Sequence, residues 1–327
     1  MAKLKNLIPE NYAVRFIFFL LSFVALYYFL KGLAFAINDN YILTILTYMA
    51  INTILALGLN LITGITGQLN LGHAAFMSIG AYTGALLTMK MNMPFGISIL
   101  AAGIMAALIG VLIGYPILRL TGDYFAITTL GFAEIVRVLF NGMEFTNGAI
   151  GISGIPRHTN FSIAWSIAVL VIILMVWLNN SRNGRSYMAI RDNEIAAESM
   201  GINTSLFKIQ SFAVGSFMGG VGGALLAHQI SFIKPDMFGF MKSIELLMMV
   251  VMGGLGSIPG TILGASLLTM APEALRVFAD YKYLIYGSLL VVMMIFRPNG
   301  ILGGVNLRQL LDFSVKKKNI ERKNLSN

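Results

Sequence analysis

Ionisable side chains within apolar stretches are the first residues of this sequence that could do chemistry. The segment GFAEIVR places Glu134 and Arg137 three residues apart, and KSIELLMM does the same for Lys242 and Glu245. Charged groups at membrane depth are costly, so they pair with one another or face a cavity. This spacing puts both members of a pair on one helical face, which favours intrahelical ion pairs. A zwitterionic solute would need both signs of charge near its route, and the pattern leaves that second interpretation open.

A second group combines polar side chains with small residues. The segment TGQLNLGHAAFMSIGAY holds Gln68, Asn70 and His73, and Asn60 lies shortly before it. Small residues let helices approach closely, and polar groups form hydrogen bonds across such contacts. The structural interpretation is helix packing. The functional interpretation is the lining of a solute pathway near a break in a helix.

Residues suited to metal or nucleophilic catalysis are few. The chain has no cysteine, and its three histidines have no metal-ligand spacing. An intramembrane enzyme would need paired catalytic groups, which this pattern does not offer. A phosphate-binding loop of the form GxxxxGK[ST] is absent from the sequence. The sequence therefore predicts neither a metal site nor an enzyme, and any ATP hydrolysis must occur on another chain.

The segment GRSYMAIRDNEIAAESMGIN, residues 184–203, differs from its surroundings by its charge. Six of the seventeen residues from Arg182 to Glu198 are charged, against 11% of the whole chain. One interpretation is an ordinary long cytoplasmic loop that carries a surface helix. The other is a protrusion on which a cytoplasmic partner docks.

Two short helices are predicted within this segment, one of about a turn over residues 186–190 and one over 194–200. Gly184 is expected to end the preceding apolar helix. The second helix has three features of helix ends, namely a cap at Asp192 or Asn193, an acidic first residue at Glu194 and a glycine at Gly201. A helix this short is marginal in water, so it must rest on another surface.

Long apolar runs must position all of these groups. The chain is 57% hydrophobic with a mean hydropathy of +0.78, and runs of about 20 apolar residues cross a bilayer. The runs are continuous rather than alternating, so the sequence predicts an all-α polytopic membrane protein. About ten spans are expected, at 14–36, 41–62, 70–89, 95–120, 124–142, 161–179, 206–228, 240–255, 258–272 and 281–297. The ninth is too short to cross alone and is interpreted as half of a broken element.

The distribution of positive charge predicts the orientation. With alternating spans, fifteen Lys and Arg residues fall on the side of the N-terminus and seven on the other side. Cytoplasmic loops carry such an excess, so both termini are expected in the cytoplasm. The same rule accounts for the net charge of +9, and no nucleic-acid partner is expected. The first span is longer than the apolar part of a signal peptide, so we expect it to be retained.

The spans can be read as an inverted repeat. Four spans, over 41–142, precede the central span 161–179, and four follow it over 206–297. Inverted repeats often place a solute route at their shared interface. The Gly-rich segments at 63–72 and 253–260 nevertheless fall on the same, cytoplasmic side, where an inverted axis would not superpose them.

Five segments carry a family resemblance. They are GLNLITGITGQLNLGHAAFMSIGAYTGA, YFAITTLGFAEIVR, GRSYMAIRDNEIAAESMGINTSLFKIQSFAVGSFMGGVGGALLA, SIELLMMVVMGGLGSIPGTILGA and RPNGILG. In this order they closely resemble branched-chain amino acid ABC transporter permeases of the LivM type, the inner-membrane component of a binding-protein-dependent transport system. The resemblance runs through most of residues 41–303.

The resemblance implies a fold and an assembly. The fold would be that of type II ABC importer permeases, with a permease domain over 1–303 and a basic cytoplasmic tail over 304–327. The chain would lie in a bacterial inner membrane, in contact with lipid. Its partners would be a LivH-type permease, two cytoplasmic ABC ATPases that bind ATP and magnesium, and a periplasmic substrate-binding protein. No cofactor is expected in this chain.

The resemblance also assigns site residues. The loop over 180–205 would couple the permease to an ATPase, through Arg185, Ala189, Arg191, Asp192, Glu194, Ala196, Ala197, Glu198 and Gly201. The candidate translocation pathway comprises Asn60, Gln68, Asn70, His73, Glu134 and Glu245.

Three alternatives remain at this stage. The solute could be an amide or urea, because related permeases serve these as well. An ion-coupled secondary transporter would be favoured by acidic clusters in broken helices and is disfavoured by a coupling loop. An intramembrane enzyme is disfavoured by the scarcity of catalytic groups.

Overall fold

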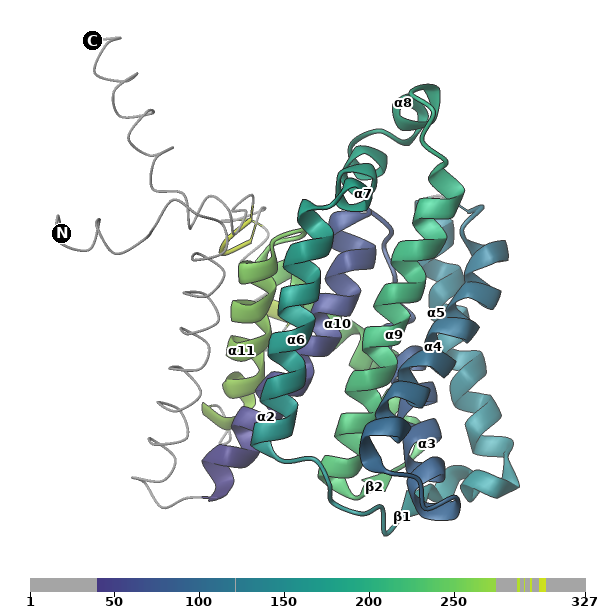
Figure 1. The fold of residues 1–327 in the computed structure, drawn as a ribbon, viewed down its shortest axis with the longest axis vertical. Helices are drawn as coiled ribbons and strands as arrows, with labels where there is room; N and C mark the ends of the chain where they lie inside the picture. The colour runs from purple at the N-terminus through teal and green to yellow at the C-terminus, as the bar shows by residue number, and fades with distance from the viewer. Residues whose placement is uncertain are drawn as a thin grey trace, which may run out of the picture.

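The computed structural model describes residues 40–120, 122–274 and 300–303, together with 287, 288, 291 and 295. Its long helices stand side by side in one bundle, with short helices projecting from one end (Figure 1). The predicted first span at 14–36 and the tail at 304–327 lie outside the described residues, as does most of the span predicted at 281–297.

The predicted helices between residues 41 and 272 are all present, with bounds that differ by a few residues. The helices are α2 Asn40–Asn60, α3 His73–Lys90, α4 Phe95–Ile117, α5 Asp123–Gly142, α6 Phe161–Asn180, α7 Arg182–Asp192, α8 Glu194–Ser199, α9 Thr204–Ile230, α10 Phe240–Gly253 and α11 Ile258–Ala274. A π-helical turn, Leu61–Ile65, extends α2, and short 3₁₀ turns lie at Glu144–Thr146, Gly148–Ile150 and Pro235–Phe238.

Five helices in the described part of the chain are long and apolar enough to cross a membrane. They are Tyr41–Ile65, Phe95–Ile117, Asp123–Gly142, Phe161–Asn180 and Thr204–Ile230. By contrast, α10 has 14 residues and α11 has 17. A helix needs about 20 residues to cross the hydrocarbon core, and over the described residues both helices are shorter than that.

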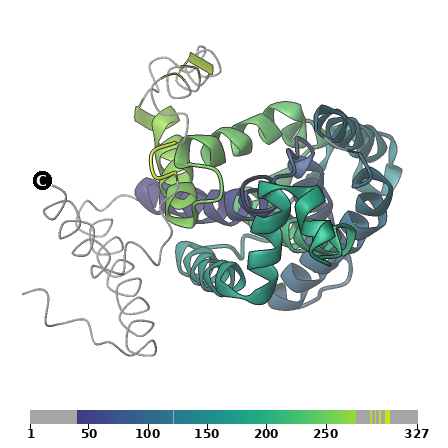
Figure 2. The same cartoon turned by 90° about the horizontal axis from the view of Figure 1, so that it is seen from above.

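Helix α9 lies at the centre of the bundle, against α2, α3 and α4 (Figure 2). Its glycines make this possible, because they face the backbone or side chains of all three neighbouring helices. A Cβ on Gly220 would lie 2.6 Å from the carbonyl oxygen of Ala102 in α4, and one on Gly222 would lie 2.6 Å from Leu55 in α2. A Cβ on Gly223 would overlap the carbonyl oxygen of Met77 in α3. Small residues thus allow the close approach typical of membrane helices.

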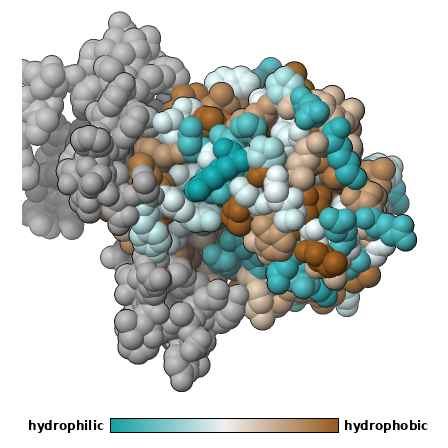
Figure 3. All heavy atoms as spheres, turned by 90° about the horizontal axis from the view of Figure 1, so that it is seen from below, coloured by the Kyte–Doolittle hydropathy of each residue, from teal (hydrophilic) through white to brown (hydrophobic). Residues whose placement is uncertain are grey.

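The opposite end of the bundle from α7 and α8 carries a short two-stranded sheet (Figure 1). Strands β1 Ile152–Ser153 and β2 Phe232–Ile233 pair antiparallel, with Ile152 opposite Ile233. Seen from this end, polar and apolar side chains are intermixed on the surface (Figure 3). The sheet fixes the loop after α5 to the end of α9.

The first helix of the loop is longer than predicted. Helix α7 covers eleven residues, whereas about one turn was expected. Gly184 lies inside α7 and does not end the preceding span, which stops at Asn180. A Cβ on Gly184 would overlap the carbonyl oxygen of Leu178, so the glycine permits the tight turn between α6 and α7. Ser181 caps α7, because its hydroxyl accepts a hydrogen bond from the Gly184 N–H at 3.2 Å.

Candidate functional site

Helix α8, the second helix of the loop at residues 180–205, has its backbone hydrogen-bonding groups capped at both ends. The Asn193 side chain accepts a hydrogen bond from the Ala196 N–H at 3.0 Å, which caps the start of α8. At the other end, the N–H of Gly201 donates to the carbonyl of Glu198 at 2.9 Å and that of Ile202 to the carbonyl of Ala197 at 3.1 Å. Gly201 has a φ of +82°, so this is a Schellman motif that favours glycine. The second predicted helix is therefore confirmed.

Two apolar side chains stand out on α8. Ile195 is 79% exposed and Met200, the residue that ends the helix, is 82% exposed. Exposed apolar residues at the tip of a projecting loop are typical of an interaction surface. Ala197, on the inner side of α8, is buried.

Helix α7 is held against the bundle by its buried face. Tyr187 and Ile190 are buried, and the Tyr187 ring packs edge-on against Phe207 of α9 with ring centroids 5.9 Å apart. Burial raises the pKa of the Tyr187 hydroxyl. On the outer face, Arg185 is exposed and donates to the carbonyl of Asn180 at 3.3 Å, while Ala189 is half-buried. The loop thus has a fixed inner side and a polar outer side.

An ion pair joins α8 to α9. The Lys208 ammonium contacts the Glu194 carboxylate, and the Lys208 side chain is only 9% exposed. The Glu194 side chain is 38% exposed, so the cation is enclosed while the carboxylate remains open to water. Lys208 was not among the predicted site residues, because nothing local links it to a residue fourteen positions earlier.

Arg191 connects the loop to two Gly-rich breaks in the bundle. The first break is the segment 63–72 between α2 and α3, and the second is the segment 253–260, where α10 ends and α11 begins. Its Nη1 donates to the carbonyl oxygen of Gly64, at 3.3 Å, in the π-helical turn after α2. A Cβ on Gly67 or on Gly256 would lie 2.9 Å from the Arg191 side chain. Both glycines have positive φ, +82° and +78°. The guanidinium also pairs with Asp192 at 2.9 Å, so it is held between its own loop and both breaks.

The two Gly-rich breaks lie side by side. The Asn60 side-chain oxygen accepts a hydrogen bond from the N–H of Gly256 at 2.8 Å. A Cβ on Gly64 would overlap the backbone nitrogen of Gly256. Both breaks therefore lie at the end of the bundle that carries α7 and α8, as the sequence predicted.

The predicted polar cluster lies together at the start of α3 and is buried. Asn70 accepts from the N–H of Gly72 at 2.8 Å, and its own N–H donates to Thr63 at 3.3 Å. His73 is fully buried next to α9, where a Cβ on Gly219 would lie 3.3 Å from its ring. The Gln68 amide nitrogen and oxygen have no hydrogen-bond partner among the described residues. The structure therefore brings Asn60, Gln68, Asn70 and His73 to one region, around the break between α2 and α3.

Two hydroxyl groups that the sequence did not single out tie this break to distant helices. Thr129 of α5 accepts from the N–H of Leu71 at 3.1 Å, and Ser243 of α10 accepts from the N–H of Ala74 at 3.1 Å. Backbone donors in the first turn of a helix have no partner within the helix, so the Ser243 bond satisfies one at Ala74, while the Thr129 bond holds the residue before the cap of α3. The start of α3 is thereby fixed to both helices.

The predicted acidic pathway residues lie elsewhere and are paired. Arg137 contacts Glu134 at 2.8 Å, as the spacing predicted, and also Asp236 at 3.0 Å. Glu245 pairs with Lys242 at 3.1 Å. The Glu134 and Arg137 side chains are about one-third exposed, at 35% and 32%. Asp236 was not predicted, because it lies 99 residues from Arg137.

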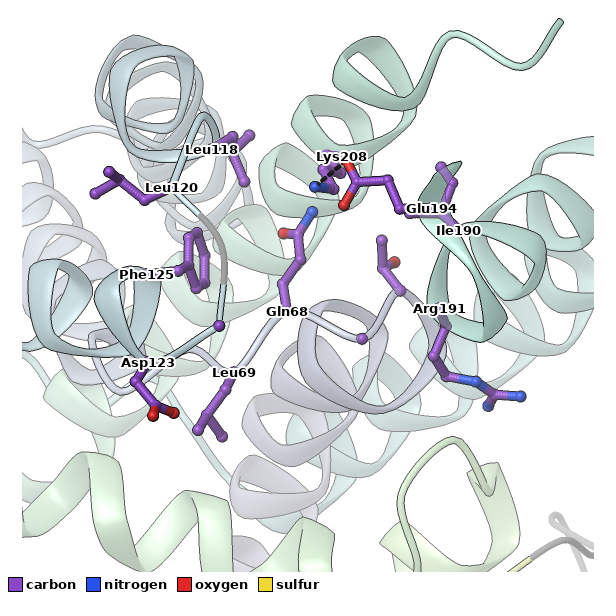
Figure 4. Close-up of a pocket in the computed structure, with 13 residues that line it drawn as sticks. Gln68, Leu69, Leu118, Leu120, Asp123, Phe125, Ile190, Arg191, Glu194 and Lys208 are labelled. Carbon is purple, nitrogen blue, oxygen red and sulfur yellow. Dashed lines mark hydrogen bonds and ion pairs between the residues drawn. The ribbon is translucent and has the colours of Figure 1, made fainter. Parts of the chain in front are cut away.

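A cavity of about 330 Å³ opens beneath the loop. Figure 4 shows the Gln68 side chain extending toward the Lys208–Glu194 pair, with Leu118 and Phe125 on the side away from the loop. The cavity is lined by residues from the break after α2, the α4–α5 connection, α7, α8 and α9. The elements that hold the loop and the break thus meet around one cavity.

Comparison with known proteins gives consistent matches. The family model for the permease component of branched-chain amino acid transport systems matches residues 41–294. The high-affinity branched-chain amino acid transport system permease protein LivM of Escherichia coli (strain K12) is 39% identical, over 79% of this chain and 69% of LivM. LivH, the permease protein named for the same system in that organism, is 27% identical, over 76% of this chain and 90% of LivH.

Among solved structures, PsaBC from Streptococcus pneumoniae in complex with Fab is similar at a TM-score of 0.46 and 15% identity. That match covers 80% of this chain and 93% of the solved chain. The chain is thus similar along most of its length to permease proteins.

Proposed function

This chain belongs to the branched-chain amino acid transport permease family, and from that membership we infer that it is the membrane-spanning permease subunit of an ATP-driven importer. The solute we propose is a branched-chain amino acid, the class in the names of LivM and LivH. The observation that carries the proposal is the loop of α7 and α8, which exposes apolar side chains outward and contacts both helix breaks inward.

The proposed partners follow from this role. Two cytoplasmic ABC ATPases would bind and hydrolyse ATP with magnesium, and one of them would receive α8 in a groove. A LivH-type permease would form the second membrane subunit, and a periplasmic binding protein would deliver the solute. The chain itself would perform no chemistry, since its contribution is movement of helices around the solute.

Two contacts would carry movement from the ATPase into the bundle. Glu194, at the start of α8, holds the enclosed Lys208 of the central helix α9. Arg191, at the end of α7, contacts Gly64 and lies against Gly256. A displacement of the loop would therefore act on α9 and on both breaks together, because a charged pair and a close-packed contact resist separation.

The solute route would pass near the polar residues of the bundle. Asn60, Gln68, Asn70 and His73 lie around the break between α2 and α3, a kind of position where backbone and side-chain polar groups can face a pathway. Glu134 is one-third exposed and shares Arg137 with Asp236, so this cluster offers both signs of charge to a zwitterion. Glu245, paired with Lys242, would contribute in the same way.

The architecture that goes with this function is that of a type II importer permease. We propose about ten membrane helices, with the spans on either side of α6 forming inverted halves and residues 1–303 forming one permease domain. Both termini, including the basic tail at 304–327, would face the cytoplasm of a bacterial inner membrane. The charged loop of α7 and α8 supports this orientation, because cationic loops favour the cytoplasmic side.

Co-purification tests the assembly. Tagged chain is isolated from gently solubilised native membranes, and the recovered proteins are identified by mass spectrometry. Two ABC ATPases and a second permease are expected. Recovery of this chain alone, also after crosslinking in intact membranes, would contradict the assembly.

Reconstituted uptake tests the solute and the energy source. The complex in proteoliposomes, with its binding protein outside and ATP inside, should accumulate labelled leucine. Uptake of acetamide or urea instead would replace the proposed solute. Uptake driven by an ion gradient without ATP would contradict the importer and favour a secondary transporter.

A matched pair of substitutions locates the ATPase contact. Ile195→Asp on α8 should remove the ATPases from the purified complex, because it places a charge in an apolar contact. Ile150→Asp makes the same change at a residue that is 80% exposed, against 79% for Ile195, in the loop after α5 at the opposite end. This control should retain the ATPases, and equal loss in both variants would contradict docking on α8.

A further inference from the structure

The cavity beneath the loop has the size and the mixed lining of a small-molecule site. At about 330 Å³ it lies at the lower end of the range for ligand pockets, roughly 300–1,000 Å³. Leu118 and Phe125 are buried and form an apolar side. Polar groups gather on the side that faces the loop (Figure 4).

Gln68 is an unpaired polar group aimed into this space. Its side chain is 7% exposed, and within the described chain neither its amide nitrogen nor its amide oxygen has a hydrogen-bond partner. Buried polar groups are rarely left without partners, and each exception calls for an explanation. An amide provides a donor and an acceptor, so it can bind a carboxylate and an ammonium group at once.

The two partners of the ion pair next to Gln68 differ in their exposure to solvent, and Glu194 is the one that can separate from Lys208. The Lys208 side chain is only 9% exposed, and it lines the cavity. Glu194 is 38% exposed on a six-residue helix, so its carboxylate can turn into solvent. A carboxylate brought by a ligand can therefore replace Glu194 at Lys208 without leaving the buried cation unpaired.

We propose that this cavity binds a free amino acid with an apolar side chain, entering from the end of the bundle that carries α7 and α8. The ligand carboxylate takes the place of Glu194 at Lys208 and accepts from the Gln68 amide nitrogen. The ligand ammonium group donates to the Gln68 amide oxygen, and its side chain packs against Leu118 and Phe125.

Binding at this site would regulate transport, a consequence that rests on the proposed function. When the ligand occupies Lys208, α8 loses its ion pair to α9. One of the two contacts that would carry movement from the ATPase into the bundle is then released, and uptake slows as the imported amino acid accumulates. The site is thus a feedback site for the product of import, separate from the delivery of solute on the opposite face.

Equilibrium binding to the full chain tests the proposal. The purified chain in lipid nanodiscs is titrated with labelled L-leucine, without ATPases or binding protein, and unlabelled isocaproate and isoamylamine serve as competitors. Saturable binding is expected, with each competitor weaker than leucine because each lacks one of the two charged groups. Absence of saturable binding to the wild-type chain would overturn the proposal.

Three variants separate the exchange from a purely structural role. Gln68→Leu should weaken binding about tenfold, the cost of losing hydrogen bonds to charged groups. Glu194→Gln should bind leucine more tightly than wild type, because it removes the competing carboxylate. Gln229→Leu, which makes the same change at an equally buried glutamine (6% exposed) near the other end of α9, should bind like wild type.

The opposite signs of the first two variants make the result decisive. Unchanged binding in Gln68→Leu, or weaker binding in Glu194→Gln, would overturn the exchange. If Gln68→Leu does not fold, the sign of the Glu194→Gln effect decides alone. ATP-driven uptake is measured on the same preparations with the partner subunits. Normal uptake without leucine binding by the isolated chain rejects only this site, whereas leucine binding without ATP-driven uptake rejects only the proposed function.

Discussion

The Arg191 Nη1 atom lies 3.3 Å from the carbonyl oxygen of Gly64, across 127 residues of sequence. This bond places the end of α7 directly on the π-helical turn where α2 breaks. The same guanidinium lies against Gly256, which follows α10. One side chain of the projecting loop therefore contacts both Gly-rich breaks, and a tilt of the loop would press on them together.

The fit of Arg191 against Gly256 leads to the first prediction. Gly256→Ala should lower ATP-driven uptake several-fold and the free energy of unfolding by about 1–3 kcal/mol beyond the backbone strain, because a Cβ there would lie 3.0 Å from the carbonyl oxygen of Gly64 and 2.9 Å from the Arg191 guanidinium. Uptake in proteoliposomes and thermal unfolding of the purified chain provide the measurements.

Gly154→Ala is the matched control for that change. Gly154 has the same φ of +78° as Gly256, but a Cβ there would have no neighbour within 4 Å among the described residues. Gly154→Ala should therefore lower the free energy of unfolding only by the cost of a left-handed residue with a Cβ, about 1–2 kcal/mol. Equal effects in both variants would show that the close fit of Gly256 against Arg191 and Gly64 contributes nothing.

The ion pair between α8 and α9 gives the second prediction. Glu194→Lys places a second cation beside the enclosed Lys208, which should destabilise the loop by about 1–3 kcal/mol and abolish uptake. The variant should still reach the membrane, as membrane fractionation would show. Glu144→Lys reverses a charge at an exposed residue outside the loop, in the turn after α5, that has no ion pair in the described chain, and it should retain most uptake.

Charge exchange completes this test. The double variant Glu194→Lys with Lys208→Glu restores opposite signs across the same contact. Partial recovery of uptake over Glu194→Lys alone is expected, because the pairing energy is a mutual property of the two residues. Normal uptake by the Glu194→Lys variant would show that the Glu194–Lys208 pair does not transmit movement from the ATPase to the bundle.

The end of α8 gives the third prediction. Gly201→Val should impair uptake and lower the stability of the loop by more than 1–2 kcal/mol, the approximate cost of a left-handed residue with a Cβ. Gly201 has a φ of +82°, which a β-branched side chain adopts at still greater cost. Gly201→Asn should be milder, since asparagine tolerates this conformation. Hydrogen exchange at the α8 amides would report the difference, and equal protection in both variants would argue against a backbone cause.

These features differ in how far the sequence could predict them. The helices and the cap at Asn193 follow from local patterns, that is, apolar periodicity, side-chain oxygens before a helix and glycine after it. The length of α7 does not follow from local patterns. A glycine at position 184 is typical of a helix end, and its close contact with the carbonyl oxygen of Leu178 is visible only in three dimensions. The same holds for the burial of Tyr187 against Phe207.

The sequence singled out polar residues that lie together around the first break, but not the contacts that they make. The polar residues around the first break stood out because they interrupt apolar runs. The partners that organise the site are distant in sequence, as Lys208 is for Glu194 and Ser243 for Ala74. No short-range pattern encodes such pairs, since they depend on how α3, α9 and α10 pack.

The last prediction concerns the charged cluster on α5. Arg137 contacts Glu134 at 2.8 Å and Asp236 at 3.0 Å, so removing either acid leaves the guanidinium one partner. Glu134→Gln and Asp236→Asn are therefore matched in their effect on Arg137. If Glu134 contacts the solute, its variant should lower uptake about tenfold, the cost of one hydrogen bond to a charged group, while Asp236→Asn should have a much smaller effect. Initial rates of leucine uptake decide between them, with ATPase co-purification expected to be normal in both. Equal uptake in the two variants would assign Glu134 to holding Arg137 and not to the solute route.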